Sequence, residues 1–293
     1  MAEMEGMIWI ALFILLLAAA FLTALHIGFR APRTRHGPRL HAAGRTARAV
    51  SFRTKGGKRL QGWLFDAGKK APVVIIIHGW GANAALMRPL AVPFIKDGMS
   101  VFLFDARGHG NSEGDGPSTM PKFAQDALSA LQWLRAQRFS GPAILCGHSI
   151  GAAAAILAAS WEPRKIAGVI SIASFAHPAR LMGRAMHKWH VPAPLIRLAL
   201  AYIEWRIGFA YEDIAPQNTI CALRCPVLLA HGAADSVIPL SDMKRIASCP
   251  HDTIETLIVD GAEHDSVDKL AAHAPRLVDF ARRAALANAR QAE

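Results

Sequence analysis

The chain has 293 residues, 52% of them hydrophobic, and it carries a formal net charge of +11. This length and apolar content predict one large α/β domain with an appendage, or two small domains. The charge is concentrated in residues 30–59, where ten basic residues occur without an acidic one. The basic run has no interleaved aromatic pattern and no nucleic-acid-binding motif accompanies it, so we expect no nucleic-acid partner.

The N-terminal segment from Met7 to Phe29 contains no charged side chain, counting histidine as neutral. About 20 apolar residues are enough for a helix to cross the hydrocarbon core of a bilayer. Glu3 and Glu5 stand where a signal peptide would carry positive charge, and no clear cleavage site ends the stretch. We therefore expect residues 1–29 to be a single-pass transmembrane anchor, with the membrane as a partner.

Residues 30–48 are predicted to be a basic juxtamembrane linker. Arginines follow the apolar segment and acidic residues precede it. The positive-inside rule then places the N-terminus outside and the following domain in the cytoplasm. The opposite orientation, with that domain on the periplasmic or extracellular side, stays open.

Residues 49–293 have the pattern of an α/β catalytic domain. A hairpin is expected from residues 50–54 and 60–65 around Gly56-Gly57, and apolar runs of strand length then alternate with segments of helix length. The expected strands are residues 72–77, 100–104, 142–146, 166–172, 226–230 and 256–259, and the expected helices are residues 84–97, 121–138, 152–159, 240–247 and 266–288. This alternation predicts a mostly parallel sheet with helices on both faces, and chemistry at the carboxyl ends of its strands.

Residues 175–219 interrupt the alternation. They contain methionines, tryptophans and aliphatic residues among basic residues and prolines. We expect a helical cap inserted into the α/β domain, and its apolar side chains Met182, Met186 and Trp189 are candidate substrate contacts. A pair of helices that only packs on the sheet is the alternative.

The segment Gly147-His148-Ser149-Ile150-Gly151 lies between an expected strand and an expected helix. A G-x-S-x-G run in this context is typical of a nucleophile elbow, in which a sharp turn presents the serine hydroxyl. A serine needs a base, and the base needs an acid that orients it. Ser149, Asp235 and His264 provide these groups in the order Ser, Asp, His, each just after an expected strand. Asp242, Asp260 and Asp265 are rival carboxylates without such a lead-in.

Five motifs now resemble one family. They are His78-Gly79-Trp80-Gly81, the run from Asp105 to Ser112, the elbow, His231-Gly232-Ala233-Ala234-Asp235, and Gly261-Ala262-Glu263-His264. From about residue 49 to 285 the chain resembles the α/β-hydrolases of the serine aminopeptidase S33, lysophospholipase and monoacylglycerol lipase-like branch. With its N-terminal segment it is most similar to the membrane-anchored Bem46-like hydrolases.

The resemblance implies a serine hydrolase that cleaves carboxylic, lipid-like or acyl esters through an acyl-enzyme. Ser149 would be the nucleophile, His264 the base and Asp235 its orienting acid, with the backbone N–H groups of Trp80 and Ile150 as the oxyanion hole. His78 and the Asp105–His109 run are expected to stabilise turns and loops. The resemblance implies no organic cofactor and no metal, and the oligomeric state is not determined by the sequence.

Two other functions stay open. The same branch includes aminopeptidases, and a free amine would need carboxylates in the cap, for which Glu204, Glu212 and Asp213 are candidates. A catalytically silent membrane scaffold is the second alternative. A haloalkane- or epoxide-type hydrolase with an aspartate nucleophile is disfavoured because position 149 is serine.

The four cysteines, Cys146, Cys221, Cys225 and Cys249, show no paired framework spacing. Cys221 and Cys225 could form half of a metal site, but no second pair of ligands accompanies them. We therefore expect reduced, mostly buried thiols in a reducing compartment.

Overall fold

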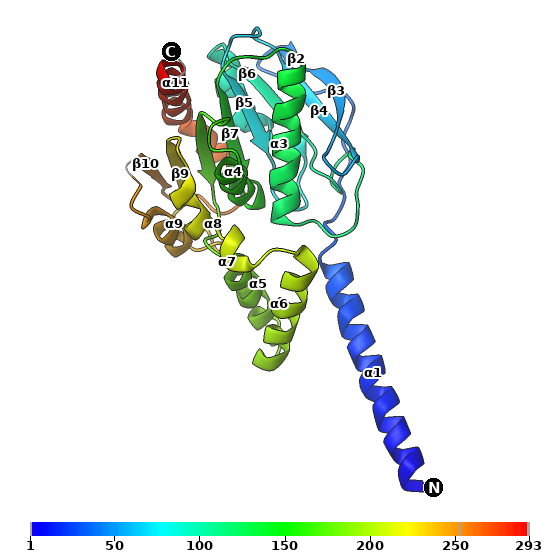
Figure 1. Cartoon of the computed structure of the whole chain (residues 1–293). Helices are drawn as coiled ribbons and strands as arrows, with labels where there is room; N and C mark the ends of the chain where they lie inside the picture. Colours follow the sequence, from blue (N-terminus) through cyan, green and yellow to red (C-terminus); the bar gives the residue numbers. More distant parts are fainter. Residues whose placement is uncertain (1, 252, 292–293) are drawn as a thin grey trace.

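The computed structural model describes residues 2–251 and 253–291 (Figure 1). Its centre is an eight-stranded sheet in the order β10-β9-β8-β7-β5-β6-β4-β3. Strands β5 to β10 run parallel, whereas β3 and β4 pair as an antiparallel hairpin, and β4 pairs antiparallel with β6. The strands are β3 (Arg48–Arg53), β4 (Arg59–Phe65), β5 (Val73–Ile77), β6 (Ser100–Phe104), β7 (Ala143–His148), β8 (Gly168–Ile172), β9 (Val227–Gly232) and β10 (Ile254–Val259). The prediction of a mostly parallel sheet is confirmed.

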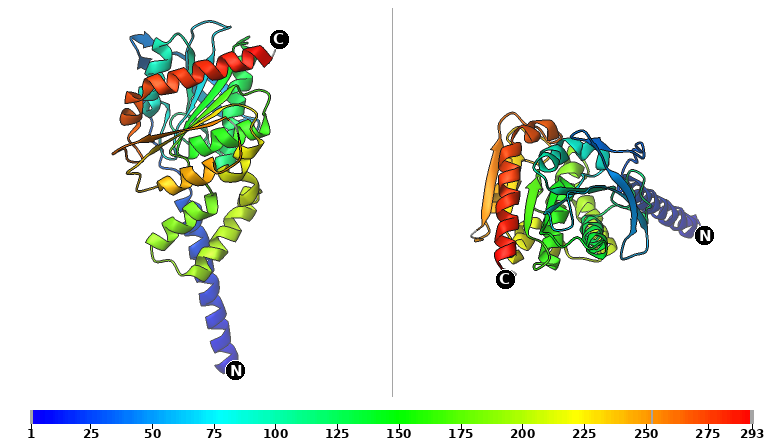
Figure 2. Two further views of the ribbon diagram at one scale, coloured as in Figure 1. Left: turned by 90° about the vertical axis from the view of Figure 1, so that its left-hand side faces the viewer. Right: turned by 90° about the horizontal axis from the view of Figure 1, so that it is seen from above.

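Helices cover both faces of this sheet (Figure 2). Alternate residues of β5 show the two layers, because Val73, Ile75 and Ile77 pack in one buried cluster while Val74 and Ile76 pack in the other. Side chains of α3, α4 and α9 contribute to the first cluster, and those of α2, α10 and α11 to the second. The bounds are η1 (Ala84–Met87), α2 (Arg88–Lys96), α3 (Met120–Ala136), α4 (Ile150–Trp161), α9 (Leu240–Ala247), α10 (Val267–Ala272) and α11 (Ala274–Gln291).

The C-terminal helix differs from the expectation, because the segment expected as one helix over 266–288 is divided at His273 between α10 and α11. Pro275 explains the break. Proline has no backbone N–H to donate and disfavours helical geometry in the residue before it, so it fits only in the first turn of a new helix.

Residues 175–219 form the cap, which lies at one end of the sheet (Figure 1). Its helices are α5 (Pro178–Lys188), α6 (Ala193–Ile207), α7 (Tyr211–Ile214) and α8 (Pro216–Thr219), followed by the short helix η2 (Ile220–Ala222). α5 and α6 enclose a small core of their own that includes Met186, Ile203 and Tyr211.

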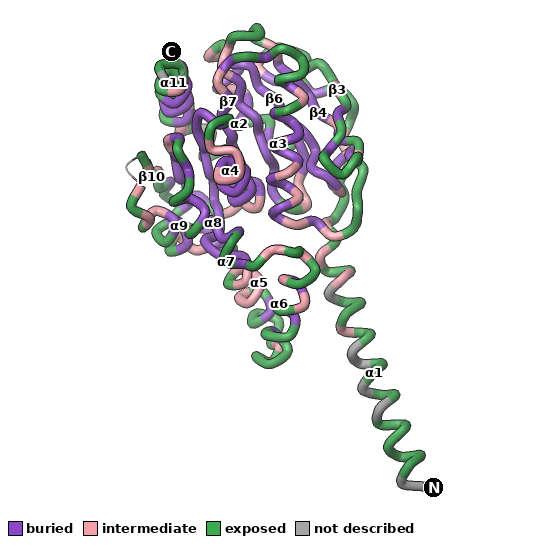
Figure 3. Tube along the Cα trace, viewed as in Figure 1, coloured by how far each residue is buried: buried purple, intermediate pink, exposed green. Residues whose placement is uncertain are grey.

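The N-terminal helix α1 (Ala2–Gly28) projects away from the α/β domain, and most of its described side chains are exposed (Figure 3). Phe21 and the following Phe29 pack against the core of the cap. Within the described residues, no helix has the length and continuous hydrophobicity that crossing a bilayer demands. The prediction of a transmembrane anchor over residues 1–29, and of the single-pass topology derived from it, is therefore wrong. An uncharged stretch is not necessarily one that spans a bilayer, and this stretch also contains Thr23, His26 and several small residues.

Residues 29–38, which we call the strap, follow α1 and lie along the α/β domain instead of forming a free linker. Arg33 donates from Nε to the carbonyl oxygen of Gly110 at 3.0 Å, and the indole of Trp63 donates to the carbonyl oxygen of Pro38 at 2.9 Å. The chain continues into a small hairpin of β1 (His41–Ala42) and β2 (Arg45–Thr46).

Cys221 and Cys249 form a disulfide, with their Cα atoms 5.8 Å apart. The expectation of four reduced thiols is wrong for this pair, because β9 and α9 bring together two residues that lie 28 positions apart. Cys146 and Cys225 are free and buried. Cys221 and Cys225 therefore do not form half of a metal site, because the sulfur of Cys221 is bonded to Cys249.

Candidate active site

Ser149 occupies a strained turn between the end of β7 and the start of α4. Its φ angle is 56°, in the left-handed region that residues with a Cβ rarely adopt. The two flanking glycines allow the turn. A Cβ on Gly147 would lie 2.1 Å from the carbonyl oxygen of Gly151, and one on Gly151 would lie 2.4 Å from that of Ile77. The G-x-S-x-G pattern therefore reflects backbone packing on both sides of the serine.

Ser149, His264 and Asp235 form one line of hydrogen bonds. His264 Nε2 lies 3.0 Å from Ser149 Oγ, and His264 Nδ1 lies 2.8 Å from Asp235 Oδ2. With the proton on Nδ1 donated to Asp235, Nε2 is free to accept the serine proton. The structure thus brings together the three residues that the sequence selected.

Asp235 is held on its other oxygen as well. Oδ1 accepts the backbone N–H groups of Val237 at 2.9 Å and Ile238 at 2.7 Å. Burial alone would raise the pKa of Asp235, but the hydrogen bonds from His264, Ile238 and Val237 outweigh it and lower the pKa. The carboxylate is therefore ionised and fixed in a position that orients His264.

His148, the residue before Ser149, has a role that the sequence did not reveal. Its Nε2 lies 2.8 Å from the backbone carbonyl oxygen of His264. Burial lowers the pKa of His148, so the neutral ring donates this hydrogen bond. His148 ties the turn that carries Ser149 to the loop that carries His264.

The loop of residues 79–83, called the oxyanion loop below, lies beside Ser149, and both line one cavity. The backbone N–H groups of Trp80 and Ile150 donate no hydrogen bond to any of the residues that the structure describes. The next amide, that of Gly81, donates to His109 Nε2 at 3.1 Å. His78 Nε2 in turn accepts the N–H of Ala106 at 3.0 Å. Both histidines support loops, as expected.

A cavity of about 1120 Å³ opens at Ser149. It is walled by apolar side chains of the cap and by the end of α1, and among these are Phe29, Leu181, Met182, Ile203 and Ile207. Of the three cap residues selected from the sequence, Met182 lines the cavity. Met186 instead packs in the cap core, and Trp189 is 80% exposed on the outside. The sequence of α1 and Phe29 contains no signal for their place in this cavity wall, because the other residues of the wall lie far from them along the chain.

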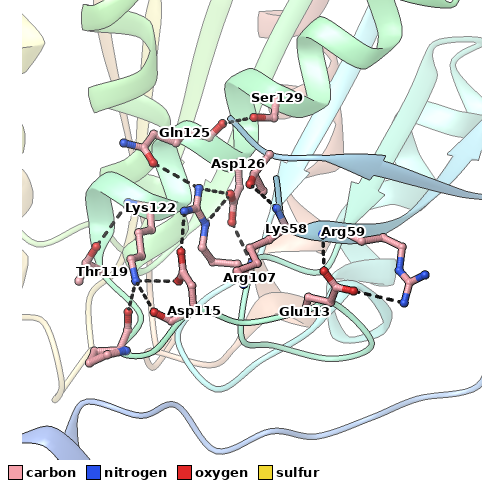
Figure 4. A network of polar contacts seen from close by, with 12 residues as sticks. Lys58, Arg59, Arg107, Glu113, Asp115, Thr119, Lys122, Gln125, Asp126 and Ser129 are labelled. Carbon is pink, nitrogen blue, oxygen red and sulfur yellow. Dashed lines mark hydrogen bonds and ion pairs between the residues drawn. The ribbon is translucent and has the colours of Figure 1, made fainter. Parts of the chain in front are cut away.

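One side of the cavity is polar, because Arg107, Asp115 and Lys122 line it. These residues belong to the network of polar contacts in Figure 4. Arg107 donates from Nε and Nη2 to Asp126 at 2.8 and 2.6 Å, and from Nη1 to Asp115 at 3.2 Å. Lys122 Nζ donates to the same Asp115 at 2.7 Å. Burial raises the pKa of Asp126 to about 6 despite the hydrogen bonds from Arg107. The two basic side chains of this network are paired with its two carboxylates. The network therefore stabilises the loop after β6 and leaves no unpaired charge of its own to bind a substrate.

Of the rival carboxylates, Asp242 is engaged by partners outside the Ser149–His264–Asp235 line. Asp242 accepts from Arg184 Nη2 at 2.8 Å and from the N–H of Ala176, which fixes the base of the cap. In the cap, Glu204 accepts the N–H of Tyr211 at 2.6 Å. Glu212 lies 3.0 Å from His177 Nε2. Neither glutamate lines the cavity at Ser149.

His148, His264 and Asp265 are grouped closely enough for a metal ion, with one potential ligand atom each within 4.8 Å of the others. The His264 nitrogens already face Asp235 and Ser149, and His148 Nε2 faces a carbonyl oxygen. A metal here would have to break the Ser–His–Asp line, so the group fits the hydrogen-bonded arrangement better than a resident ion.

Comparisons with known proteins show the family and the fold of the chain. Residues 68–217 match the family described as serine aminopeptidase, S33. An uncharacterised protein of Mycobacterium tuberculosis, Rv2307c, is 30% identical over 227 residues, which cover 76% of this chain and 74% of that protein. The bovine mitochondrial palmitoyl-protein thioesterase ABHD10 is 25% identical over 82% of this chain and 81% of its own.

Among solved structures, the Pyrococcus furiosus esterase Pf2001 superposes with a TM-score of 0.69 at 20% identity, covering 86% of this chain and 97% of that one. At this identity the likeness shows the fold alone, and it confirms the α/β-hydrolase architecture. The narrower similarity to Bem46-like proteins is not tested by these comparisons. The family match, the Mycobacterium relative and the shared fold together show that the chain belongs to the serine aminopeptidase S33 family of α/β-hydrolases.

Proposed function

We propose that this protein hydrolyses carboxylic esters or thioesters of apolar acyl groups, with Ser149 as nucleophile. One observation carries the proposal, namely the hydrogen-bonded line Ser149–His264–Asp235 at the mouth of a large, mainly apolar cavity. The likeness to a palmitoyl-protein thioesterase supports the inclusion of thioesters.

In this mechanism His264 takes the proton of Ser149 as the hydroxyl attacks the acyl carbon. Asp235 stabilises the imidazolium that forms. The negative oxygen of the tetrahedral intermediate is held by the N–H groups of Trp80 and Ile150, which are not otherwise engaged among the described contacts. His264 then protonates the leaving group, and a water molecule that it activates releases the acyl group from Ser149.

The cavity favours an apolar acyl chain. Its volume of about 1120 Å³ lies just above the usual range of ligand pockets, which is roughly 300–1,000 Å³. An ester whose acyl chain packs against Phe29, Met182 and Ile203 in the cavity would place its carbonyl carbon at Ser149.

An aminopeptidase is less well supported. The cap carboxylates expected to recognise a free amine are not available for it. The cap residues Glu204 and Glu212 are engaged in hydrogen bonds inside the cap and lie outside the cavity wall. A silent scaffold is also disfavoured, because the line from Ser149 to Asp235 is intact.

The test is hydrolysis of p-nitrophenyl esters with acyl chains from two to sixteen carbons by the full-length chain. We expect activity that rises with chain length and is lost in Ser149→Ala. Ser160→Ala, a matched change in the same helix α4, should keep full activity because its hydroxyl bonds only to the carbonyl oxygen of Leu157. Mass spectrometry of the wild type after rapid quenching should show an acyl adduct on the peptide containing Ser149.

Ester hydrolysis that survives in Ser149→Ala would refute the proposed nucleophile. Hydrolysis of aminoacyl arylamides in preference to every ester would refute the substrate class while leaving the nucleophile in place.

A further inference from the structure

The strap passes directly beside the oxyanion loop, although about 45 residues separate them in the sequence. Asn83, the last residue of the loop, donates from Nδ2 to the carbonyl oxygen of Thr34 at 3.0 Å. Pro32 lies so close to Gly81 that a Cβ on this glycine would be 3.1 Å from its ring. The strap therefore forms a wall behind the residues proposed to bind the oxyanion.

Asp105 connects the strap to the end of this loop. Its fully buried carboxylate accepts the N–H of Ala84, where the loop ends and η1 begins, and the N–H of Asn111, both at 2.8 Å. Its third partner is His36 of the strap, whose Nε2 lies 3.2 Å from Oδ2. One carboxylate thus holds three chain segments together.

The surroundings of His36 select its charged form. Nε2 faces the carboxylate of Asp105, and Nδ1 lies 3.0 Å from the carbonyl oxygen of Gly37. Both neighbours only accept hydrogen bonds, and a neutral imidazole has one N–H to donate. Only the imidazolium satisfies both contacts. Its side chain is 12% exposed and lies tilted against the ring of Trp63, with the ring centroids 4.7 Å apart, so water cannot fully replace a lost contact.

The other ionisable groups around this site do not replace the charge of His36. Burial and the nearby His109 lower the pKa of His78 to about 4, and burial lowers the pKa of His109. Both rings are therefore neutral at physiological pH. Arg33 directs its guanidinium to the carbonyl oxygens of Gly110 and Ser112, away from Asp105.

We propose that His36 is a positioning residue for the oxyanion hole, which in its imidazolium form clamps Asp105 and thereby holds the loop that carries the Trp80 N–H. The inference rests on the proposed function, because the oxyanion hole matters only if Ser149 attacks an acyl carbon. It assigns the strap a role in the reaction that neither the family nor the sequence motifs indicate.

The proposal has a consequence for pH dependence. The hydrogen bond with Asp105 raises the pKa of His36 above the ordinary value of a histidine. As the pH rises through that raised pKa, the ring loses one of its two contacts and the loop loosens. Activity should then decline at high pH, whereas without this effect of His36 it would not.

The test compares wild type with His36→Gln, which keeps one donor for Asp105 but cannot be charged. With p-nitrophenyl acetate, we expect kcat of His36→Gln to fall about tenfold with little change in KM, because the donor to Asp105 loses its positive charge and charge-assisted hydrogen bonds are roughly twice as strong as neutral ones. We also expect its kcat/KM to lack the decline at high pH that the wild type shows. His41→Gln is the matched control, since His41 is exposed and, among the described residues, its side chain hydrogen-bonds to Thr46 and not to Asp105.

A second measurement does not depend on activity. Hydrogen exchange of the peptide spanning residues 79–87 should be faster in His36→Gln than in the wild type at pH 6.5, and the difference should shrink at pH 9. The inference would be overturned if this peptide exchanged at the same rate in His36→Gln and in the wild type at both pH values. It would also be overturned if kcat/KM of His36→Gln still declined at high pH as it does in the wild type. A wild type no more active than Ser149→Ala would instead refute the proposed function, and the exchange experiment would still decide the role of His36.

Discussion

His148 Nε2 donates to the backbone carbonyl oxygen of His264 at 2.8 Å, so the residue beside the nucleophile also holds the loop of the base. Replacing His148 by leucine removes the donor and leaves a carbonyl oxygen unsatisfied, which costs about 1–3 kcal/mol. We expect kcat to fall about tenfold or more in His148→Leu, measured with a short ester.

The matched control for this change is His251→Leu. His251 also donates from Nε2 to a backbone carbonyl oxygen, that of Leu223 at 2.9 Å, but it does not line the cavity. It should lose stability in a thermal melt and keep its kcat. An equal fall of kcat in both variants would show that His148 acts only through stability.

Met182 should set the length of the acyl chain, because it lies in the cavity wall formed by the cap. In Met182→Trp the larger side chain shortens the apolar space, and we expect the optimum of the ester series to move to shorter chains with little change for acetate. Leu198→Trp on the exposed face of α6 is the control and should leave the chain-length profile unchanged. A profile that does not move in Met182→Trp would place the acyl chain elsewhere.

Gly151 cannot take a side chain. A Cβ there would lie 2.4 Å from the carbonyl oxygen of Ile77 and 2.5 Å from that of His78, so the start of α4 would have to move away from the sheet. We expect Gly151→Ala to lose essentially all esterase activity and to melt at a lower temperature. Gly183→Ala in α5 has no atom within 4 Å of the new Cβ and should be neutral or stabilising by up to about 1 kcal/mol.

The disulfide between Cys221 and Cys249 should stabilise the end of the cap. Closing a loop of this size lowers the entropy of the unfolded chain by the equivalent of about 3 kcal/mol. Urea unfolding with and without a phosphine reductant should show this difference for the wild type. The variant Cys221→Ser should unfold at the lower midpoint in both conditions, and a reductant effect that persists in it would implicate another thiol.

The contact between His36 and Asp105 predicts how stability depends on pH. Because the pKa of His36 is raised in the folded state, its contribution is complete below the ordinary histidine pKa of about 6.5 and is lost as the pH rises through the raised pKa. The melting temperature of the wild type should therefore exceed that of His36→Gln most at pH 6 and least at pH 9. A constant difference would mean that the ring does not titrate in this range.

The sequence predicts best those features of the fold that depend on residues close together along the chain. Strands such as β5 appear as continuous apolar runs because both faces of the sheet are covered. Ser149, Asp235 and His264 could be selected because each follows such a run, and the glycines around Ser149 mark a turn that only they allow.

Contacts between distant segments left no comparable signal. His36 and Asp105 are 69 positions apart, and nothing in the basic run distinguishes His36 from its neighbours. The same holds for the disulfide and for Phe29 in the cavity wall. The prediction of a membrane anchor failed for a different reason, since an uncharged stretch was equated with a bilayer-spanning one.

The hydrogen bond between His264 and Ser149 joins residues that lie 115 positions apart, one before the cap segment in the sequence and one after it. Closing so long a stretch of chain is entropically costly and slow, and parallel strands must pair in register before the two residues meet. We therefore expect the line of Ser149, His264 and Asp235 to be among the last features to form when the chain folds. In a refolding experiment, the recovery of hydrolysis should lag behind the recovery of the circular dichroism signal of the helices. Enzymatic activity would then report on completion of the fold.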